Sequence, residues 1–239
     1  MKIPELNPED FSSIVFFTGA GMSSESGIPT YRGAAGIWQE YNWEEYASQH
    51  AFDSNPEKVL DFHELRRSRV LACQPHTGHA VISAIQNKHG NCWIVTQNID
   101  GLHQRAGSTN VVELHGSLWR MRCAKHGVFE DLGNQYETRR CRDCDNWLRP
   151  DVTWFNDFLD INVMEKAHRL ISKAGLFVSI GTSGVVYPAA LFPQLASEAG
   201  ATCVYINTEV PADGSIYDII VQVKASEALM KMFPGFANE

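Results

Sequence analysis

The sequence predicts an α/β protein with a doubly wound, parallel sheet and a small inserted module. Five short apolar runs recur along the chain, and stretches of helical pattern separate them. The runs are apolar almost throughout, which is typical of strands buried on both faces of a parallel sheet. Their alternation with helices indicates βαβ units. The strands are expected at 13–18, 92–96, 176–180, 203–206 and 219–223, and the helices at 56–71, 77–88, 161–174, 189–199 and 226–232.

Two stretches interrupt this alternation. Residues 30–55 are aromatic and contain glycine without a clear period, whereas residues 118–150 are polar and carry a cysteine cluster. We interpret the second stretch as a module inserted into the sheet domain. The sheet domain is therefore expected to comprise residues 1–117 and 151–239, and a chain of 239 residues has room for both parts.

The composition excludes several classes of protein. Hydrophobic residues make up 44% of the chain and charged residues 20%, unlike a disordered chain or a coiled coil. No apolar run is long enough for a transmembrane helix, and the first residues lack the pattern of a secretory signal. A net charge of -8 argues against general nucleic-acid binding and is compatible with a basic peptide partner. We therefore expect a cytoplasmic monomer with no nucleic-acid or membrane partner.

The cysteine cluster has the spacing of a zinc site. Cys123 and His126 form one pair and Cys141 and Cys144 a second, with fourteen residues between His126 and Cys141. Paired knuckles of this kind are typical of structural zinc, and four filled positions leave none open for a catalytic water. The alternative is a decayed site with three free thiols. The remaining cysteines are expected to be ordinary buried thiols in a reducing compartment.

A glycine loop follows the first predicted strand directly. Strand 13–18 runs into Gly19, Ala20 and Gly21, and a helical turn is expected next. Glycines at a strand end let backbone amides approach a phosphate closely, and the positive end of a helix favours the same anion. The spacing departs from the common dinucleotide fingerprint, because the next glycine is Gly27. On this motif alone, a tight turn of small residues is nearly as good an interpretation as nucleotide binding.

Four motifs occur in order along the chain. They read GAGMSSESGIPTYRG from Gly19, QNIDGLH from Gln97, ELHGS from Glu113 and GTSGVVYPA from Gly181. Together they closely resemble the motifs of the sirtuins, a family of NAD-dependent protein deacylases. The resemblance implies a Rossmann-like NAD-binding domain with a structural zinc module, and protein or peptide substrates that carry acylated lysine. It also implies the release of nicotinamide and O-acyl-ADP-ribose.

The resemblance further implies a set of NAD-binding residues. Tyr31 stands where the family usually has Phe, so its hydroxyl needs a partner. Gln97, Asn98 and Asp100 follow a strand end, where their amides and carboxylate can orient ribose and carboxamide groups, although alone they predict a turn. The full set comprises Gly19, Ala20, Gly21, Ser23, Tyr31, Arg32, Gln97, Asn98, Asp100, Gly181, Thr182, Ser183, Asn207, Glu209 and Ala225.

His115 matches the catalytic histidine of the family, and Asn98 and Asp100 are expected to act with it. A lone histidine after an apolar run is more often structural. The resemblance implies instead that the acyl oxygen attacks the nicotinamide ribose and that His115, as general base, then activates a ribose hydroxyl. A side chain whose free pKa is about 6.5 suits this proton transfer at neutral pH.

Four residues are expected to contact the substrate. Phe155 begins a stretch that resembles the segment with which sirtuins bind a peptide by strand addition, and Val152 lies just before it. Asn156 replaces the usual glycine there and still tolerates a left-handed conformation. His63 and Arg66 align with a Tyr and an Arg that hold the acyl carboxylate in desuccinylases. The alternative for Arg66 is a solvated helix face beside acidic neighbours.

Three functions remain in competition at this point. The first is an NAD-dependent deacylase that removes acetyl, and also succinyl or malonyl groups if Arg66 forms an acid pocket. The second is a mono-ADP-ribosyltransferase on the same fold. The third is a non-catalytic NAD-binding module, which His115 argues against because a sensor needs no general base.

Overall fold

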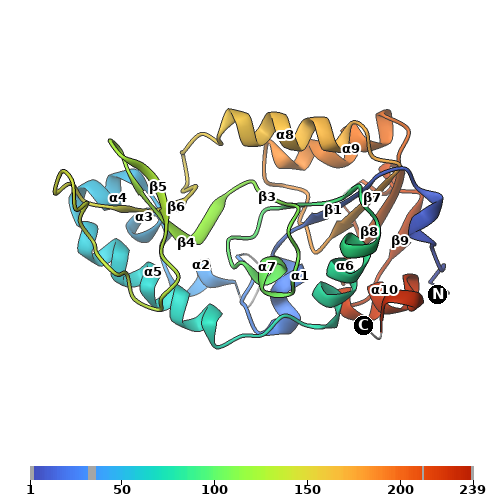
Figure 1. Ribbon diagram of the computed structural model, residues 1–239, viewed down its shortest axis with the longest axis horizontal. Helices are drawn as coiled ribbons and strands as arrows, with labels where there is room; N and C mark the ends of the chain where they lie inside the picture. The colour runs from blue at the N-terminus through green and yellow to red at the C-terminus, as the bar shows by residue number, and fades with distance from the viewer. Residues whose placement is uncertain (1–2, 32–35, 212, 238–239) are drawn as a thin grey trace.

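The computed structural model describes residues 3–31, 36–211 and 213–237, and within them six parallel strands form one sheet (Figure 1). Across the sheet they are β3 (Val111–Glu113), β2 (Cys92–Thr96), β1 (Ile14–Thr18), β7 (Leu176–Ile180), β8 (Thr202–Ile206) and β9 (Ile219–Val221). Numbered within this sheet alone, the order is 3-2-1-4-5-6, the doubly wound order of dinucleotide-binding folds. The chain reverses its winding direction between β1 and β7. The predicted fold class is confirmed.

Strand β1 shows why every predicted strand is apolar throughout. Ile14 and Phe16 belong to one buried cluster, and Val15 and Phe17 belong to another on the opposite face. Because successive side chains point to opposite faces, a strand covered on both sides must be apolar at every position. Figure 1 shows α8 (Ile161–Ile171) and α9 (Phe192–Glu198) over one face, and α6 (Thr77–Lys88) and α10 (Ala225–Met232) over the other.

The predicted helices are present, with corrected ends. The helix expected at 161–174 ends at Ile171, and the one expected at 226–232 begins at Ala225. The helix expected at 189–199 is two elements, because a 3-10 turn, η3 (Ala189–Leu191), precedes α9 and Pro193 occupies the first turn of α9. Proline lacks the backbone donor that an uninterrupted helix would use there. The remaining 3-10 helices are η1 (Pro8–Asp10), η2 (Ser24–Ser26), η4 (Gly214–Ile216) and η5 (Pro234–Phe236).

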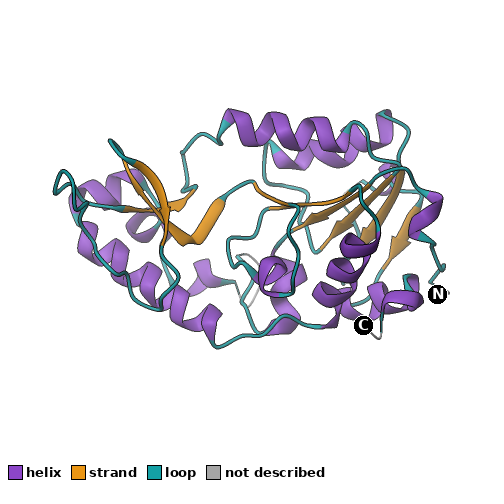
Figure 2. Cartoon of the chain, viewed as in Figure 1, coloured by secondary structure: helices purple, strands orange, loops and turns teal. Residues whose placement is uncertain are grey.

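A second, smaller lobe contains the other sheet (Figure 2). Its three antiparallel strands lie in the order β5 (Gly127–Glu130), β4 (Gly116–Cys123) and β6 (Arg149–Val152). The stretch 30–55, which showed no clear period, forms the short helices α2 (Ile37–Glu40), α3 (Trp43–Tyr46) and α4 (Gln49–Ser54) in its described part. Together with α5 (Pro56–Leu71), α4 packs on the small sheet in one buried cluster. The domain boundaries at 118 and 150 stay a prediction.

A buried ion pair joins α5 to the small sheet. Arg67 is 0% exposed, and its Nη2 lies 2.6 Å from Oδ1 of Asp131, which is also buried. The guanidinium also donates to the backbone oxygens of Asp131 and Gly133, and lies over the rings of Trp119 and Tyr136. Several bonds to one charge are needed to offset the cost of burying it.

None of the described helices combines the length and the apolar character that crossing a membrane requires.

Candidate functional site

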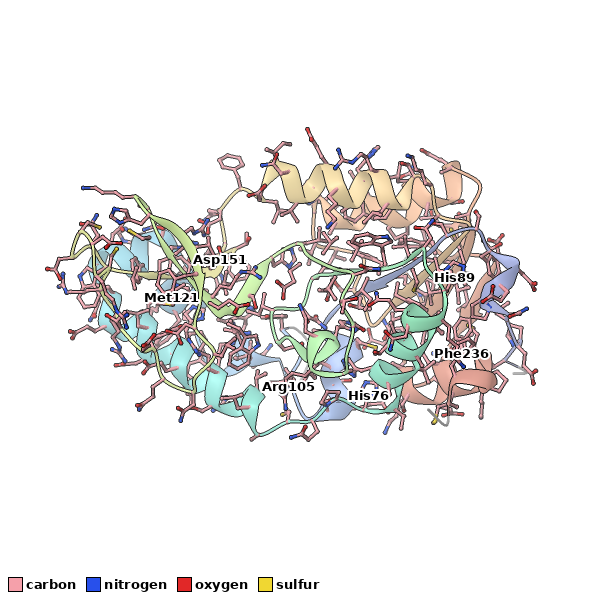
Figure 3. All side chains as sticks on the ribbon, viewed as in Figure 1. His76, His89, Arg105, Met121, Asp151 and Phe236 are labelled. Carbon is pink, nitrogen blue, oxygen red and sulfur yellow. The ribbon has the colours of Figure 1, made fainter. Side chains whose placement is uncertain are left out.

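A cavity of about 1190 Å³ lies between the two lobes, at the carboxyl ends of the sheet strands. Open α/β sheets place ligands at this edge, where the winding direction reverses. The volume exceeds the roughly 300–1,000 Å³ of an ordinary small-molecule site. The cavity therefore has room for a dinucleotide and part of a second substrate. Side chains from both lobes approach this region (Figure 3).

The floor of the cavity is built from backbone. Gly19 and Gly21, at the start of α1 (Ala20–Ser23), pass directly against Gly181 after β7. The Gly19 amide donates to the Ile180 carbonyl at 3.0 Å, and the Gly21 amide donates to the Gly181 carbonyl at 3.0 Å. A Cβ on Gly21 would lie 2.6 Å from the Gly181 Cα, so no side chain fits. These glycines and Ala20 line the cavity, and the glycines have no side chain to keep a phosphate away from the backbone.

The predicted residues toward the β8 side also line the cavity. They are Thr182, Ser183, Asn207, Glu209 and Ala225. The Asn207 amide group donates to the Thr182 carbonyl at 3.1 Å and to the Tyr205 hydroxyl at 2.8 Å, which fixes the loop after β8.

Asn98, Ser23 and Asp100 form one buried network beside the cavity. The Asn98 Nδ2 donates to the Gly19 carbonyl at 3.0 Å and to the Ser23 hydroxyl at 3.2 Å, and Ser23 donates to Asp100 at 2.7 Å. Burial raises the pKa of the Asp100 carboxyl, although the Leu102 amide and the Ser23 hydroxyl oppose this. Ser23 and Asp100 line a small recess, not the large cavity, and Asn98 lines both. Arg32 lies outside the described residues.

His115 lies in the short link between β3 and β4, where the two lobes join. Its Nδ1 is 3.0 Å from the Gln97 carbonyl oxygen, so Nδ1 carries the hydrogen and donates it. This leaves Nε2 as an unprotonated acceptor. Burial lowers the pKa of His115, and the bond to Gln97 opposes that in part. His115 and Gln97 both line the cavity, so the geometry supplies a base there at neutral pH.

An ion cluster holds this link in place. Arg120 of β4 pairs with Glu113 of β3 at 2.5 Å and with Asp151 of β6 at 2.8 Å. Gly116 has φ 74°, and a Cβ there would lie 2.0 Å from the Asp151 oxygen. The close approach of Gly116 to Asp151 and the two ion pairs of Arg120 together fix the direction in which the chain leaves β3 at His115.

The predicted substrate residues line the lobe side of the cavity. Val152, Phe155, His63 and Arg66 all face it. His63 is fully buried, and its Nε2 accepts a hydrogen bond from the Trp154 indole at 3.1 Å. Burial and the nearby arginines hold the pKa of His63 well below its ordinary value, so it is neutral.

Helix α5 carries no solvated basic face at residues 66 and 67. Arg66 lines the cavity and donates to the Tyr31 hydroxyl at 2.9 Å, and Arg67 is buried against Asp131. The acidic neighbours Asp61 and Glu64 pair instead with Arg139. The alternative interpretation of Arg66 as a solvated charge beside these acids is therefore wrong.

The stretch that is predicted to bind the peptide has a left-handed backbone conformation at Asn156. Its φ is 68°, within the left-handed region that asparagine tolerates better than most residues. Asp157 accepts from the Trp154 amide and pairs with Arg149. These contacts anchor the loop that begins at Phe155.

Sequence reasoning missed the aromatic wall of the cavity. Trp38, Trp43 and Trp154 line it beside Phe155, and the rings of Trp43 and Phe155 lie 4.5 Å apart. The available signal was the aromatic character of residues 30–55. An apolar wall of this kind excludes water from a reacting group.

The four predicted metal ligands come together in the small lobe. The ligand atoms of Cys123, His126, Cys141 and Cys144 all lie within 4.8 Å of one another. The Cys123 Sγ is 3.7 Å from the Cys144 Sγ and 3.6 Å from the His126 Nδ1. A tetrahedral zinc site with ordinary bond lengths separates its ligand atoms by about 3.5–3.8 Å. The donor set therefore fits zinc.

Comparison with known proteins agrees with this site. The model of the Sir2 family matches residues 19–188. An NAD-dependent protein deacylase of Aquifex aeolicus is 40% identical over 227 residues, covering 92% of this chain and 94% of the relative. A second NAD-dependent protein deacylase, from Pyrobaculum aerophilum, is 44% identical over 91% of this chain and 88% of its own.

Solved structures give the same result. A Sir2 homologue in complex with NAD superimposes with a TM-score of 0.87 at 34% identity, covering 99% of this chain and 96% of that chain. A Sir2 homologue variant with ADP-ribose has a TM-score of 0.88 at 35% identity, covering 95% and 92%. The predicted resemblance is confirmed, and the chain belongs to the Sir2 family.

Proposed function

We propose that the protein is an NAD-dependent protein-lysine deacylase that releases nicotinamide and O-acyl-ADP-ribose. The observation that carries the proposal is the placement of His115. Its Nδ1 is fixed by the Gln97 carbonyl, and its free Nε2 belongs to a cavity that the glycine loops also line. The names of the relatives support the same activity.

The residues at the sheet edge fit NAD. Gly19, Gly21 and Gly181 pack so closely that a Cβ on any of them would clash with neighbouring backbone. With Ala20 they line the cavity at the start of a helical turn, which suits a pyrophosphate. We propose that Tyr31 and Arg32 cover the nicotinamide ribose and that Thr182, Ser183, Asn207, Glu209 and Ala225 hold the adenosine half. Bound NAD would supply an electrophilic ribose carbon, with nicotinamide as the leaving group, and the ribose hydroxyl that carries the acyl group in the product.

Protein side chains supply orientation and proton transfer. We propose that Gln97 and Asn98, which line the cavity, orient the sugar and carboxamide groups, and that Asp100 acts with them through the buried hydrogen bonds that join it to Ser23 and Asn98. His115 takes a proton at Nε2. The aromatic wall and the half-buried position of His115 keep bulk water away from that atom.

Zinc in the small lobe would be structural. Cys123, His126, Cys141 and Cys144 would fill all four tetrahedral positions. The ligands come from both ends of the polar stretch 118–150, so the metal closes that stretch into a module. No ligand lines the cavity, so the metal takes no part in the chemistry.

The position of Arg66 supports a further class of substrate, lysine that carries an acidic acyl group. Within the described residues, its guanidinium has no carboxylate partner, although it is half-buried and lines the cavity. A cation in that position favours an anion. We therefore propose succinyl- and malonyl-lysine as substrates in addition to acetyl-lysine.

A matched turnover assay tests the proposal. One peptide would carry acetyl-lysine or succinyl-lysine, with NAD present, and product mass would be measured. His115→Ala should lower turnover by at least 100-fold while ADP-ribose still binds. His50→Ala, an exposed histidine on α4, is the matched control and should change nothing. ADP-ribose attached to the peptide, with the acyl group retained, would favour the transferase instead.

Cell location and assembly are part of the proposal. We propose a cytoplasmic monomer without a nucleic-acid partner. The net charge of -8, and six described cysteines of which none forms a disulfide, support it. Sedimentation analysis with and without a DNA oligonucleotide measures both assembly and binding.

A further inference from the structure

Arg66 has a single polar partner among the described residues, the hydroxyl of Tyr31. The Arg66 Nη2 donates to the Tyr31 Oη at 2.9 Å. The guanidinium lies 5.4 Å from the centre of the Tyr31 ring and 5.9 Å from that of Phe62. Two aromatic faces and one phenol hold the cation, and no carboxylate among the described residues forms an ion pair with it. Its charge does act on Asp100 across the small recess, where it partly opposes the rise in pKa that burial causes in that carboxyl. The remaining N–H groups of Arg66 are therefore available to an anion that enters the cavity.

His63, which aligns with the phenol of desuccinylases, is a poor second donor. Its Nε2 already accepts the Trp154 indole hydrogen at 3.1 Å, so that nitrogen carries no hydrogen of its own. The ring is 0% exposed, and burial keeps the pKa low enough for the neutral form. The hydrogen of the neutral ring therefore lies on Nδ1, which is buried and has no hydrogen-bond partner among the described residues, so it is not presented to the cavity. His63 holds Trp154 through Nε2.

Tyr31, in contrast, has a hydroxyl hydrogen on a side chain that lines the cavity. Its oxygen accepts from Arg66, so its own O–H hydrogen remains free to donate to another acceptor. The ring stacks on Trp38 at 6.2 Å with 30° between the planes, which restricts where the hydroxyl lies. Both Tyr31 and Arg66 line the cavity that contains His115. Two donor groups 2.9 Å apart suit the two oxygens of one carboxylate.

We propose that Tyr31 determines acyl specificity: with Arg66, its hydroxyl binds the terminal carboxylate of a succinyl- or malonyl-lysine side chain. The inference rests on the proposed deacylase function. It assigns the phenol of the acid pocket to the loop after α1 instead of to helix α5. The ring of Tyr31 keeps its expected place near the nicotinamide ribose, and only the hydroxyl serves the acyl group.

The test compares two acyl groups on one peptide in the variant Tyr31→Phe. A hydrogen bond to a charged group is lost only with succinyl-lysine, so the ratio of kcat/KM for succinyl to that for acetyl should fall about tenfold or more. The fall should come from a higher KM for the succinyl peptide. Any effect of the variant on NAD binding is common to both substrates and cancels in the ratio.

Tyr41→Phe is the matched control. Tyr41 accepts from Arg69 of the same helix at 3.5 Å, but neither residue lines the cavity. Its removal should leave the ratio unchanged. An unchanged ratio in Tyr31→Phe would overturn the proposal, and so would a fall in His63→Gln instead, which would place the donor at residue 63.

Failure of the proposed deacylase function would give a different result from failure of the proposal for Tyr31. If the unmodified protein turns over neither peptide, the deacylase proposal fails, and calorimetric binding of the two peptides with ADP-ribose present then decides on Tyr31. Tighter binding of the succinyl peptide that is lost in Tyr31→Phe supports the inference. Equal binding of the two peptides overturns it.

Discussion

The two walls of the cavity are built in different ways. On the sheet side, Gly19, Gly21 and Gly181 meet backbone to backbone above two apolar clusters. On the lobe side, aromatic side chains line the cavity, and the buried Arg67–Asp131 pair and the four metal ligands hold the lobe together. The backbone sets the shape of the sheet side, so that shape depends little on which side chains are present. Side chains set the shape of the lobe side, so that shape changes when those residues are substituted.

This difference matches what each wall has to bind. A pyrophosphate is the same in every reaction cycle, so a fixed backbone cradle suits it. The acyl group is the variable part of the substrate, and Tyr31, His63 and Arg66 stand where it would lie. His115 lies in the link between the two walls, clamped by Arg120. We therefore expect that a substitution on the sheet side mainly weakens NAD binding, and that a substitution on the lobe side mainly weakens binding of the acyl peptide.

Removal of the metal should have the largest effect. Structural zinc contributes apparent free energies of about 10–16 kcal/mol to small zinc-finger peptides, so the lobe should lose its fold when the metal is removed. We expect a large loss of acyl-peptide turnover but retained ADP-ribose binding, measured by calorimetry after chelation or in Cys141→Ser. Cys73→Ser, a thiol outside the cluster, is the control. Parallel loss of ADP-ribose binding would contradict the separation of the walls.

Arg67→Met should have the next largest effect. It leaves the buried Asp131 carboxylate without its partner, and breaking a buried pair costs about 3–5 kcal/mol of unfolding free energy. Lys58→Met on the same helix breaks an exposed pair with Glu45 and should change the unfolding free energy far less, because water and salt screen exposed pairs. Urea unfolding measures both variants. If Arg67→Met costs no more than Lys58→Met, the ion pair does not hold the lobe together.

The sheet wall was predictable from the sequence, for physical reasons. A doubly covered strand must be apolar at each position, so 92–96 and 176–180 could be read to the residue. The glycine loop and the cysteine spacing are local patterns whose chemistry demands those residue types. The structure brings the four predicted ligands together, including His126.

The lobe wall was only partly predictable. Nothing in the local pattern shows that Arg67 is buried while the adjacent Arg66 lines a cavity, because their partners Asp131 and Tyr31 are distant in sequence. The short helices of residues 37–54 have too few turns for a visible period. Trp38 and Trp43 therefore could not be assigned to the cavity. Long-range packing, not propensity, decides these positions.

A methyl group at Gly21 should damage the sheet wall alone. In Gly21→Ala the Cβ would lie 2.6 Å from the backbone of Gly181, and forced overpacking costs about 1–3 kcal/mol. We expect ADP-ribose affinity to fall about tenfold or more, measured by calorimetry, because the cradle itself must move. Gly90→Ala adds a Cβ with no atom within 4 Å and should change nothing. Retained affinity in Gly21→Ala would show that the cradle tolerates movement.

The smallest expected effect is a shift in the pH dependence of turnover, and it concerns the link between the walls. Burial lowers the pKa of His115 below its ordinary value of 6.5. The base works when deprotonated, so kcat/KM should fall as pH decreases through this lowered pKa, and the midpoint of the acid limb should lie below 6.5.

NMR titration of labelled histidine, with the His115 signal assigned by its absence in His115→Ala, gives the same pKa directly. Burial also raises the pKa of the Asp100 carboxyl, so the two measurements must agree before the limb is assigned to His115. A His115 pKa at or above 6.5 would mean that the link is open to water, and that the two walls do not enclose the base.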